Sequence, residues 1–443
     1  MKLERIKTGL NLKIVITIVW IILASLNLIG QDTLSFQDCM NRMLENNYRI
    51  KQQLATEQSY RLNIKKAQDA RLPGVNANLN ANSNWGRGID PSTNTYISQQ
   101  FNNYNGGISS DLTLFNGFYH INNIKLQKQD LEKNKSELQK IKNELLIDLV
   151  SRYTNVLFFA EQIKNAQSQI KLSGENIEQT QLKINAGVVA KREIHRFIAQ
   201  RDNEELNLIS AQNSLEQNLL EIKLLINEDP AKPIFIRDID MMSQLLSKKQ
   251  PIGEEHKFQI SQFPSLQIAR QEYEKSKTRV KLAKSSFYPT LNLGANLSSA
   301  YSTANTLFGF EDQIDNNRSM GLGLSAQIPI FNRFQTRNNV KEALINKDRS
   351  ELNLQIETQN AYRTMLTAVN NLHASQKKYL VSTSALKSNQ ANYEADKIRM
   401  EAGRINFQEL NTSKANYFNS LLNLTKDKYE WIFNAIVLDI YED

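Results

Sequence analysis

The sequence predicts an α+β membrane protein in which each chain supplies four membrane-spanning β-strands and two pairs of very long helices. Three observations predict this fold class: an export signal at the start, a duplication with constant spacing, and alternating strands followed by long stretches without proline. The chain has 443 residues, which would suffice for two or three ordinary domains, so length alone decides little.

The first thirty residues have the layout of a secretory signal. A basic start precedes an apolar run over 14–28, and the small or polar residues Gly30 and Gln31 follow. The apolar run is shorter than the roughly 20 residues that a membrane-spanning helix needs. We therefore expect 1–30 to be a signal peptide that is cleaved after Gly30.

The chain is duplicated with an offset of 216 residues. Pro73, in LPGVNANLNAN, returns as Pro289 in YPTLNLGANLS. The segment DLTLFNGF at 111–118 returns as QIPIFNRF at 327–334, and Ala-Gly at 186–187 returns at 402–403. Because three anchors keep one offset, we interpret the chain as two copies of one structural unit.

Each copy contains two segments in which apolar and polar residues alternate. In the first copy, apolar residues from Val75 to Ala81 alternate with asparagines, and the corresponding segment from Leu291 to Leu297 does the same. The returning segments alternate from Ile108 to Leu114 and from Met320 to Ile330. A period of two predicts strands with one apolar face, and about ten residues is the length that a tilted strand needs to cross a bilayer. A soluble sandwich would need more than four strands.

Four strands are too few to close a barrel, because about eight are needed to fill its interior. An open edge is not tolerated in lipid. The chain must therefore take further strands from copies of itself, and the strand count permits a dimer of eight strands or a trimer of twelve.

Two stretches of about 60 residues, 121–183 and 337–399, lack proline and, apart from Gly174, glycine. Apolar residues recur at steps of three and four, which predicts coiled-coil-like helices roughly 90 Å long. After turns marked by Gly187 and Gly403, returning helices are expected over about 190–227 and 405–438. Each copy should therefore end in an antiparallel helical hairpin.

Several functional classes are disfavoured by composition. The net charge is +8, but basic and acidic residues are interleaved over 125–148, which is typical of a solvated helix and not of a nucleic-acid surface. The single cysteine, Cys39, has no intrachain partner and is interpreted as a buried helix residue. The four histidines are scattered, so we expect no enzyme, cofactor or metal site.

This order of elements resembles the TolC-like outer-membrane efflux proteins over essentially the whole mature chain. The matching points are the two strand-entry prolines, the corners LFNGF and IFNRF, and the hairpin tips NAGVVAKREI (185–194) and EAGRINFQEL (401–410). The resemblance implies a homotrimer with a twelve-strand outer-membrane β-barrel that continues into a long periplasmic α-helical barrel. It also implies a function as passive exit duct of a tripartite efflux or type I secretion system, with a periplasmic adaptor protein and an inner-membrane pump or ABC exporter as partners.

The resemblance assigns two kinds of site residue to the tips. Adaptor contacts are expected just after the tip glycines, at Gly187, Val188, Val189, Ala190, Gly403, Arg404 and Ile405. An acidic ring at the periplasmic constriction is expected from Glu409, with Thr412 at the position where a second acidic residue would stand and Glu193 as the repeat equivalent of Glu409. The alternatives are hairpin packing for the first group and ordinary solvated side chains for the second.

The expected organisation has five parts. They are a signal peptide (1–30), a first repeat (31–226), an equatorial linker (227–262), a second repeat (263–430) and a C-terminal equatorial segment (431–443). The alternative function is a periplasmic coiled-coil adaptor or structural spacer, which would share the helical hairpins but lack the two strand pairs. The transported substrate is not predicted.

Overall fold

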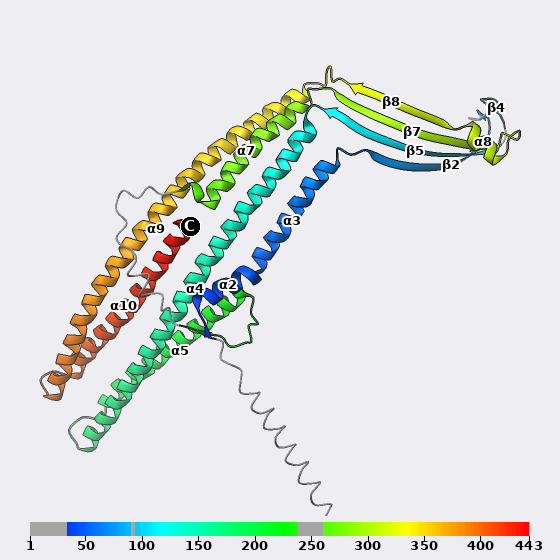
Figure 1. Ribbon diagram of the computed structural model, residues 1–443. Coiled ribbons are helices and arrows are strands. Elements are labelled where there is room, and N and C mark those ends of the chain that lie inside the picture. Colours follow the sequence, from blue (N-terminus) through cyan, green and yellow to red (C-terminus); the bar gives the residue numbers. More distant parts are fainter. Residues whose placement is uncertain (1–32, 90–93, 99, 238–259, 443) are drawn as a thin grey trace, which may run out of the picture. The chain divides into compact units, whose positions relative to one another are not determined.

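The computed structural model describes residues 33–89, 94–98, 100–237 and 260–442 (Figure 1). The expected signal peptide and most of the expected linker, 227–262, lie outside the described residues. The chain divides into two compact units, one made of 1–51, 141–258 and 364–443 and the other of 52–140 and 259–363. We call them the helical unit and the sheet unit, and both expected repeats contribute to each.

The sheet unit contains one antiparallel four-stranded sheet (Figure 1). Its order is β2 (Gly74–Asn84), β5 (Phe101–Asn116), β7 (Thr290–Ser302) and β8 (Ser319–Gln327). The four strands confirm the two strand pairs expected from the alternation. Within the chain, β2 and β8 are edge strands, because each is paired on one side alone among the described residues.

The sheet has one apolar and one polar face. Residues opposite each other on neighbouring strands point to the same face. One row across the four strands reads Ala77, Ile108, Leu297 and Met320. The adjacent row, on the other face, reads Asn76, Ser109, Asn296 and Gly321. The register therefore aligns the period-two patterns of both repeats on the same faces.

Three local features differ from the sequence expectation. The strand expected to extend to Ile330 ends at Gln327, since Pro329 has no N–H with which to continue the ladder. The first strand-connecting loop contains a small hairpin of β3 (Gly88–Ile89) and β4 (Tyr96–Ile97). The second contains a short helix, α8 (Phe310–Asn316), whose buried Gln313 side chain donates to the carbonyl oxygens of Ser302, Asn305 and Phe308.

Four helices adjoin the sheet: α3 (Tyr48–Asp69), α4 (Tyr119–Asn185), α7 (Pro264–Ser285) and α9 (Gln335–Glu401). A short 3-10 turn, η1 (Ile260–Gln262), precedes α7. The two long helices have 67 residues each, which confirms the expected long stretches and corresponds to about 100 Å. No helix in the described ranges is long and apolar enough to cross a membrane.

Left-handed residues turn the corners between strand and long helix. Gly117 and Phe118 have φ of 63° and 68°, and their repeat equivalents Arg333 and Phe334 have 55° and 62°. A Cβ on Gly117 would lie 2.2 Å from the Ser285 carbonyl oxygen, so this corner requires glycine. The equivalent corner follows edge strand β8 and tolerates arginine in a conformation that disfavours L side chains.

The helical unit combines α2 (Phe36–Asn46), α5 (Glu193–Ile226), α10 (Phe407–Glu442) and the remaining parts of α4 and α9. A two-residue strand, β1 (Thr33–Leu34), pairs in parallel with β6 (Phe235–Ile236), and the Tyr153 hydroxyl donates to the carbonyl oxygens of Leu34 and Arg237 beside them. Cys39 is fully buried, as expected, and burial raises the pKa of its thiol to about 12. Helix α10 is continuous through Trp431, so the expected C-terminal segment 431–443 starts inside a helix.

Candidate functional site: the hairpin tips and the cavity behind them

The two hairpin tips of the helical unit have the same backbone turn. Gly187 follows α4 with φ of 73°, and Gly403 follows α9 with φ of 67°, so both glycines that mark the expected turns have a left-handed backbone. At the first tip, the Val188 N–H donates to the Lys183 carbonyl oxygen and Gly187 donates to Ile184, each at 3.0 Å. Arg404 and Gly403 donate to Arg399 and Met400 in the same way. Both tips are therefore Schellman turns, which satisfy the last carbonyl groups of the helix.

The expected adaptor-contact residues lie at these turns. Val188 is the most exposed apolar side chain among them, with 74% of its surface accessible. Gly187, Ala190, Gly403 and Arg404 are also exposed, and Val189 and Ile405 are partly buried. The tips are thus accessible in the single chain and stiffened by backbone hydrogen bonds, which suits a docking surface.

The three residues expected at the constriction have different surroundings. Glu409 is exposed in the first turn of α10, where its carboxylate accepts from the Asn406 side chain at 2.7 Å while its N–H donates back to Asn406. Thr412 is exposed and donates to the Gln408 carbonyl oxygen. Glu193 forms ion pairs with Arg192 and Arg196 at 3.5 and 3.2 Å. Asn406 therefore caps α10, and the Glu409 carboxylate forms no ion pair with a described basic residue, whereas Glu193 is compensated by two arginines.

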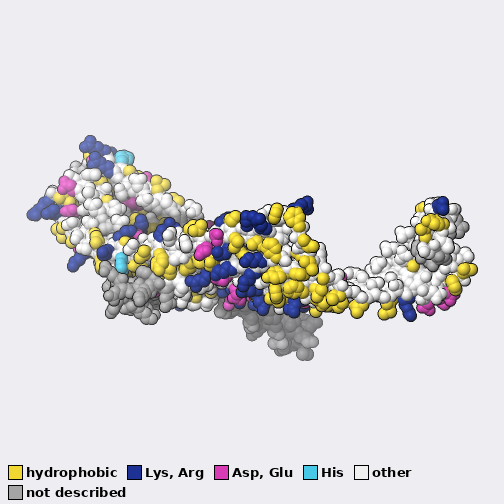
Figure 2. Space-filling view, turned by 90° about the horizontal axis from the view of Figure 1, so that it is seen from above, with side chains coloured by type: hydrophobic (Ala, Val, Ile, Leu, Met, Phe, Trp, Pro, Cys, Tyr) yellow, Lys and Arg dark blue, Asp and Glu magenta, His cyan; other side chains and the backbone are white. Residues whose placement is uncertain are grey.

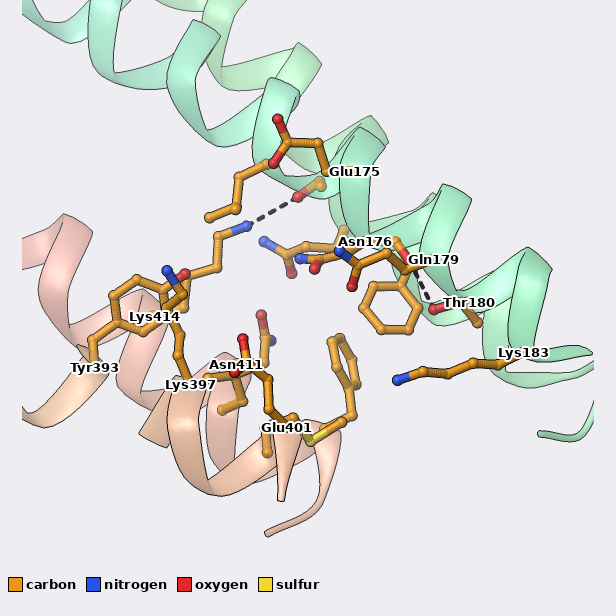
Figure 3. Close-up of a pocket in the computed structure, with 17 residues that line it drawn as sticks. Glu175, Asn176, Gln179, Thr180, Lys183, Tyr393, Lys397, Glu401, Asn411 and Lys414 are labelled. Carbon is orange, nitrogen blue, oxygen red and sulfur yellow. Dashed lines mark hydrogen bonds between the residues drawn. The ribbon is translucent and has the colours of Figure 1, made fainter. Parts of the chain in front are cut away.

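A cavity of about 290 Å³ lies behind the tips, between the α4–α5 hairpin and the α9–α10 hairpin. Asn176, Gln179 and Lys183 extend from α4 toward Asn411 of α10 (Figure 3). The rings of Phe197 on α5 and Phe407 on α10 also line it, with centroids 4.0 Å apart. Amides and lysines therefore mix with aromatic rings along its wall.

One wall of this cavity contains a buried ion pair that the sequence did not reveal. The Lys414 ammonium on α10 lies 3.0 Å from the Glu204 carboxylate on α5 and donates to the Ser173 hydroxyl of α4 at 2.9 Å. Ser173 in turn donates to Glu204 at 2.6 Å, and the charged side chains are only 6% and 3% exposed. The group connects three helices. No local sequence pattern indicates this group, because its members are 31 to 241 residues apart.

The chemistry at the tips is suited to docking and electrostatic selection. Within the described ranges, no three His, Cys, Asp or Glu side chains are grouped so that they could hold a metal ion. The features that the structure does bring together are two matched turns, one exposed carboxylate on α10 and a polar cavity closed on one side by a buried ion pair.

Relatives at the sequence level are outer-membrane proteins. The chain is 22% identical over 298 residues to the outer membrane protein TolC of Escherichia coli (strain K12) and 20% identical over 296 residues to that of Salmonella enteritidis. These alignments cover 66% of this chain but only 60% and 59% of the two relatives. The chain thus matches about three fifths of the length of these curated relatives.

Solved structures show the same fold over more of the chain. The CusC structure, whose description concerns transmembrane channel formation, superimposes with a TM-score of 0.79 at 16% identity and covers 92% of this chain and 91% of that one. The CmeC outer membrane channel of Campylobacter jejuni gives 0.76 at 16% identity, with 92% and 85% covered. The open state of the MtrE outer membrane channel of Neisseria gonorrhoeae gives 0.72 at 15% identity, with 92% and 88% covered.

A family model covers both repeats. The model described as outer membrane efflux protein matches residues 39–228 and 260–439, which together make up most of the chain. The match includes the paired strands, both long helices and both tips, and its gap falls within the expected linker. The chain belongs to the outer membrane efflux protein family.

Proposed function

We propose that this protein is the outer-membrane exit duct of a tripartite efflux or type I secretion system, and that it works as a homotrimer. In this proposal, twelve strands from three chains form a barrel in the outer membrane, and the helices extend into the periplasm. Conduction is passive, so energy and substrate choice come from an inner-membrane pump or ABC exporter that is joined through a periplasmic adaptor. Family membership supports a channel over a periplasmic spacer.

The observation that carries the proposal is the sheet with two different faces and two open edges. An apolar face suits lipid, and a face rich in Asn, Ser and Gly suits a water-filled lumen. Lipid does not tolerate unpaired backbone groups at β2 and β8. Pairing β8 of one chain with β2 of the next removes both edges when the ring closes.

The duplication specifies the register of this closure. Within the chain, Ile108 of β5 lies opposite Leu297 of β7. Moving the β5 position forward and the β7 position back by 216 residues places Leu324 of β8 opposite Ala81 of β2 in the next subunit. The same shift of the pair Ser110 and Ala295 places Ala326 opposite Leu79. Both pairs belong to the apolar face, so the register that continues the repeat around the ring also continues the apolar band.

The tips support the proposed partners. Both tips have the same hydrogen-bonded turn, so a trimer would present six similar tips, two from each chain. We propose that the adaptor contacts the two tips around Val188 and Arg404. A photo-reactive residue at either position should capture an adaptor protein in whole cells, and the same residue at the buried position Leu149 should capture none.

Channel formation is tested by fractionation and conductance. The protein should enter the outer membrane and give unit conductance steps in a planar bilayer. Leu324→Pro should abolish the steps, because proline removes a backbone N–H in the middle of β8 and disrupts the strand through which the barrel must close. Thr306→Pro, in the loop before α8, is the matched control and should conduct. A soluble periplasmic protein without conductance would refute the proposal in favour of a spacer.

A further inference from the structure

The net positive charge of the chain is concentrated where four helices meet the sheet. Four segments of 14 residues form these junctions: 61–74, 116–129, 277–290 and 332–345, the last two being the first two shifted by 216. Together they contain 13 Lys and Arg residues against two Asp and Glu, a net charge of +11, whereas the whole chain carries +8. We call these segments the basic band.

Most charges of the basic band are exposed and lack a carboxylate partner. Twelve of the 13 basic side chains are exposed. Arg61, Lys277 and Arg279 pair with glutamates of their own helices, and the other ten form no ion pair with a described residue. The band is also repeated, since Lys65 and Lys125 of the first copy correspond to Lys281 and Lys341 of the second.

Exposed aromatic rings join the basic band to the apolar face of the sheet. Phe115 pairs with Leu291, which is on the apolar face, and its ring contacts Phe118 at 5.2 Å. Phe118 also contacts Tyr288 at 6.0 Å, and both of these rings are about half exposed. These rings therefore lie on the side of the sheet unit that would face lipid.

The second copy connects the same rings directly to a charge. Phe331 and Phe334, the equivalents of Phe115 and Phe118, are 5.4 Å apart. The Arg337 guanidinium lies 5.5 Å over the Phe334 ring. Lys341 follows Arg337 by four residues and so lies on the same face of α9. By the repeat, Lys125 of α4 corresponds to Lys341 and follows the corner residue Phe118 by seven positions, as Lys341 follows Phe334.

Strands that span a bilayer would place the basic band at the depth of the lipid headgroups. Lys125 and Lys341 lie six residues after the first residues of α4 and α9. Lys65 and Lys281 lie four residues before the last residues of α3 and α7. All four lysines are therefore about 6–9 Å along the helix axis from the helix end that adjoins the sheet. The headgroup region of a bilayer is about 5–8 Å thick on each side. Basic and hydrophobic side chains gather together on the helices next to the strands (Figure 2).

We propose that the basic band binds the phosphate headgroups of anionic phospholipids in the leaflet that surrounds the helix–strand junction. The inference rests on the proposed function, because it requires the strands to span a bilayer. Aromatic rings anchor the junction at the interface, and the lysines and arginines extend into the headgroups, where each basic side chain favours anionic over neutral lipid. A lumenal position for the same face would leave the aromatic rings in water.

The test compares lipids around the intact reconstituted channel. Spin-labelled phosphatidylglycerol and phosphatidylcholine are added to phosphatidylcholine vesicles that hold the native protein, and their relative association with the protein is measured. We expect phosphatidylglycerol to be preferred by at least about threefold at low salt and the preference to fall toward one as salt screens the charges. Equal association at low salt would overturn the proposal.

Charge variants locate the preference. Changing Lys65, Lys125, Lys281 and Lys341 together to Gln should remove most of it, and changing them to Arg should retain it. The matched control changes Lys171, Lys377, Lys387 and Lys426 to Gln; these are exposed lysines of the helical unit without a described ion pair, and their loss should leave the preference intact. A control that lost the preference equally would overturn the inference.

Conductance separates this inference from the proposed function. If the Gln variant conducts but has lost the lipid preference, both proposals are supported. If the native protein conducts without any lipid preference, only the lipid site fails. If the native protein gives no conductance in either lipid, the proposed function fails, and the lipid site fails with it.

Discussion

At the scale of single residues, the stability of the helical unit depends on the buried pair of Lys414 and Glu204. Each charge is desolvated and depends on the other, with Ser173 and Gln200 completing the hydrogen bonds of the carboxylate. Removing one partner of such a pair leaves an uncompensated buried charge, which generally costs about 3–5 kcal/mol. The pair therefore holds α5 and α10 together only while both members are present.

We predict that Glu204→Gln lowers the free energy of unfolding by about 3 kcal/mol, measured by chemical unfolding in detergent. The double variant Glu204→Leu with Lys414→Met should recover much of the loss, since it removes both buried charges. Glu205→Gln changes an exposed neighbour on the same helix and should cost less than about 1 kcal/mol. Equal stability of Glu204→Gln and native protein would contradict this account of the pair.

Glu409 allows a second test at the residue scale. Its carboxylate is exposed and unpaired by described basic groups, so copies of it around an axis would create a negative focus that favours cations. Glu409→Gln keeps an acceptor for Asn406 but removes the charge. We predict that the cation-to-anion permeability ratio falls by about twofold or more in single-channel recordings. Glu178→Gln, on the exposed surface of α4, should have no effect; unchanged selectivity in Glu409→Gln would exclude the ring.

At the scale of elements, α4 and α7 are joined by a network of charges within the sheet unit. Lys275 lies 2.6 Å from Asp130 and 3.0 Å from Glu272, while Lys133 and Arg279 also contact Glu272 at 3.3 and 2.6 Å. Burial alone would raise the pKa of Glu272, but hydrogen bonds from Lys275 and Arg279 outweigh it and lower the pKa to about 2. The network therefore favours the folded state when Glu272 is ionised.

This lowered pKa predicts an acid-dependent loss of stability. Because the folded-state pKa lies below the usual value of 4.5, the contribution of Glu272 is complete above about pH 4.5 and is lost as the pH falls toward 2. Glu272→Gln should lower the free energy of unfolding by about 1–2 kcal/mol at pH 7, a range that allows for solvent screening of a side chain that is 27% exposed. The same change should flatten the pH dependence of stability between about pH 4.5 and 2. Glu274→Gln is the exposed control. Parallel pH profiles for Glu272→Gln and native protein would contradict the network.

The elements that the sequence predicted are those with a long, regular signal. The alternation around Asn76 and Asn78 specifies a strand with a polar face, and the absence of proline specifies α4 and α9. The small hairpin of β3 and β4 and helix α8 were missed because elements of two to seven residues are too short to show a period. The Lys414 pair was missed for a different reason, since it depends on how two hairpins rotate against each other.

At the scale of the whole molecule, duplication explains both the architecture and the need for assembly. The two copies give a sheet in which β5 and β7 are paired centrally and β2 and β8 remain at the edges. The need for further strands could be derived from the sequence, because four cannot close a barrel. The number of subunits could not, because the strand count permits either eight or twelve; the proposal of three chains rests on family resemblance.

The register of the β8–β2 closure tests this account most directly. In a chain carrying Ala81→Cys and Leu324→Cys, mild oxidation of native outer membranes should link neighbouring subunits into a covalent trimer, while buried Cys39 stays unmodified. The control pair Asn80→Cys and Leu324→Cys places the two thiols on opposite faces of the sheet and should link poorly. A covalent dimer as the end point, absence of cross-linking in the first pair, or equal cross-linking of the control would contradict a barrel closed by three copies in the register of the repeat.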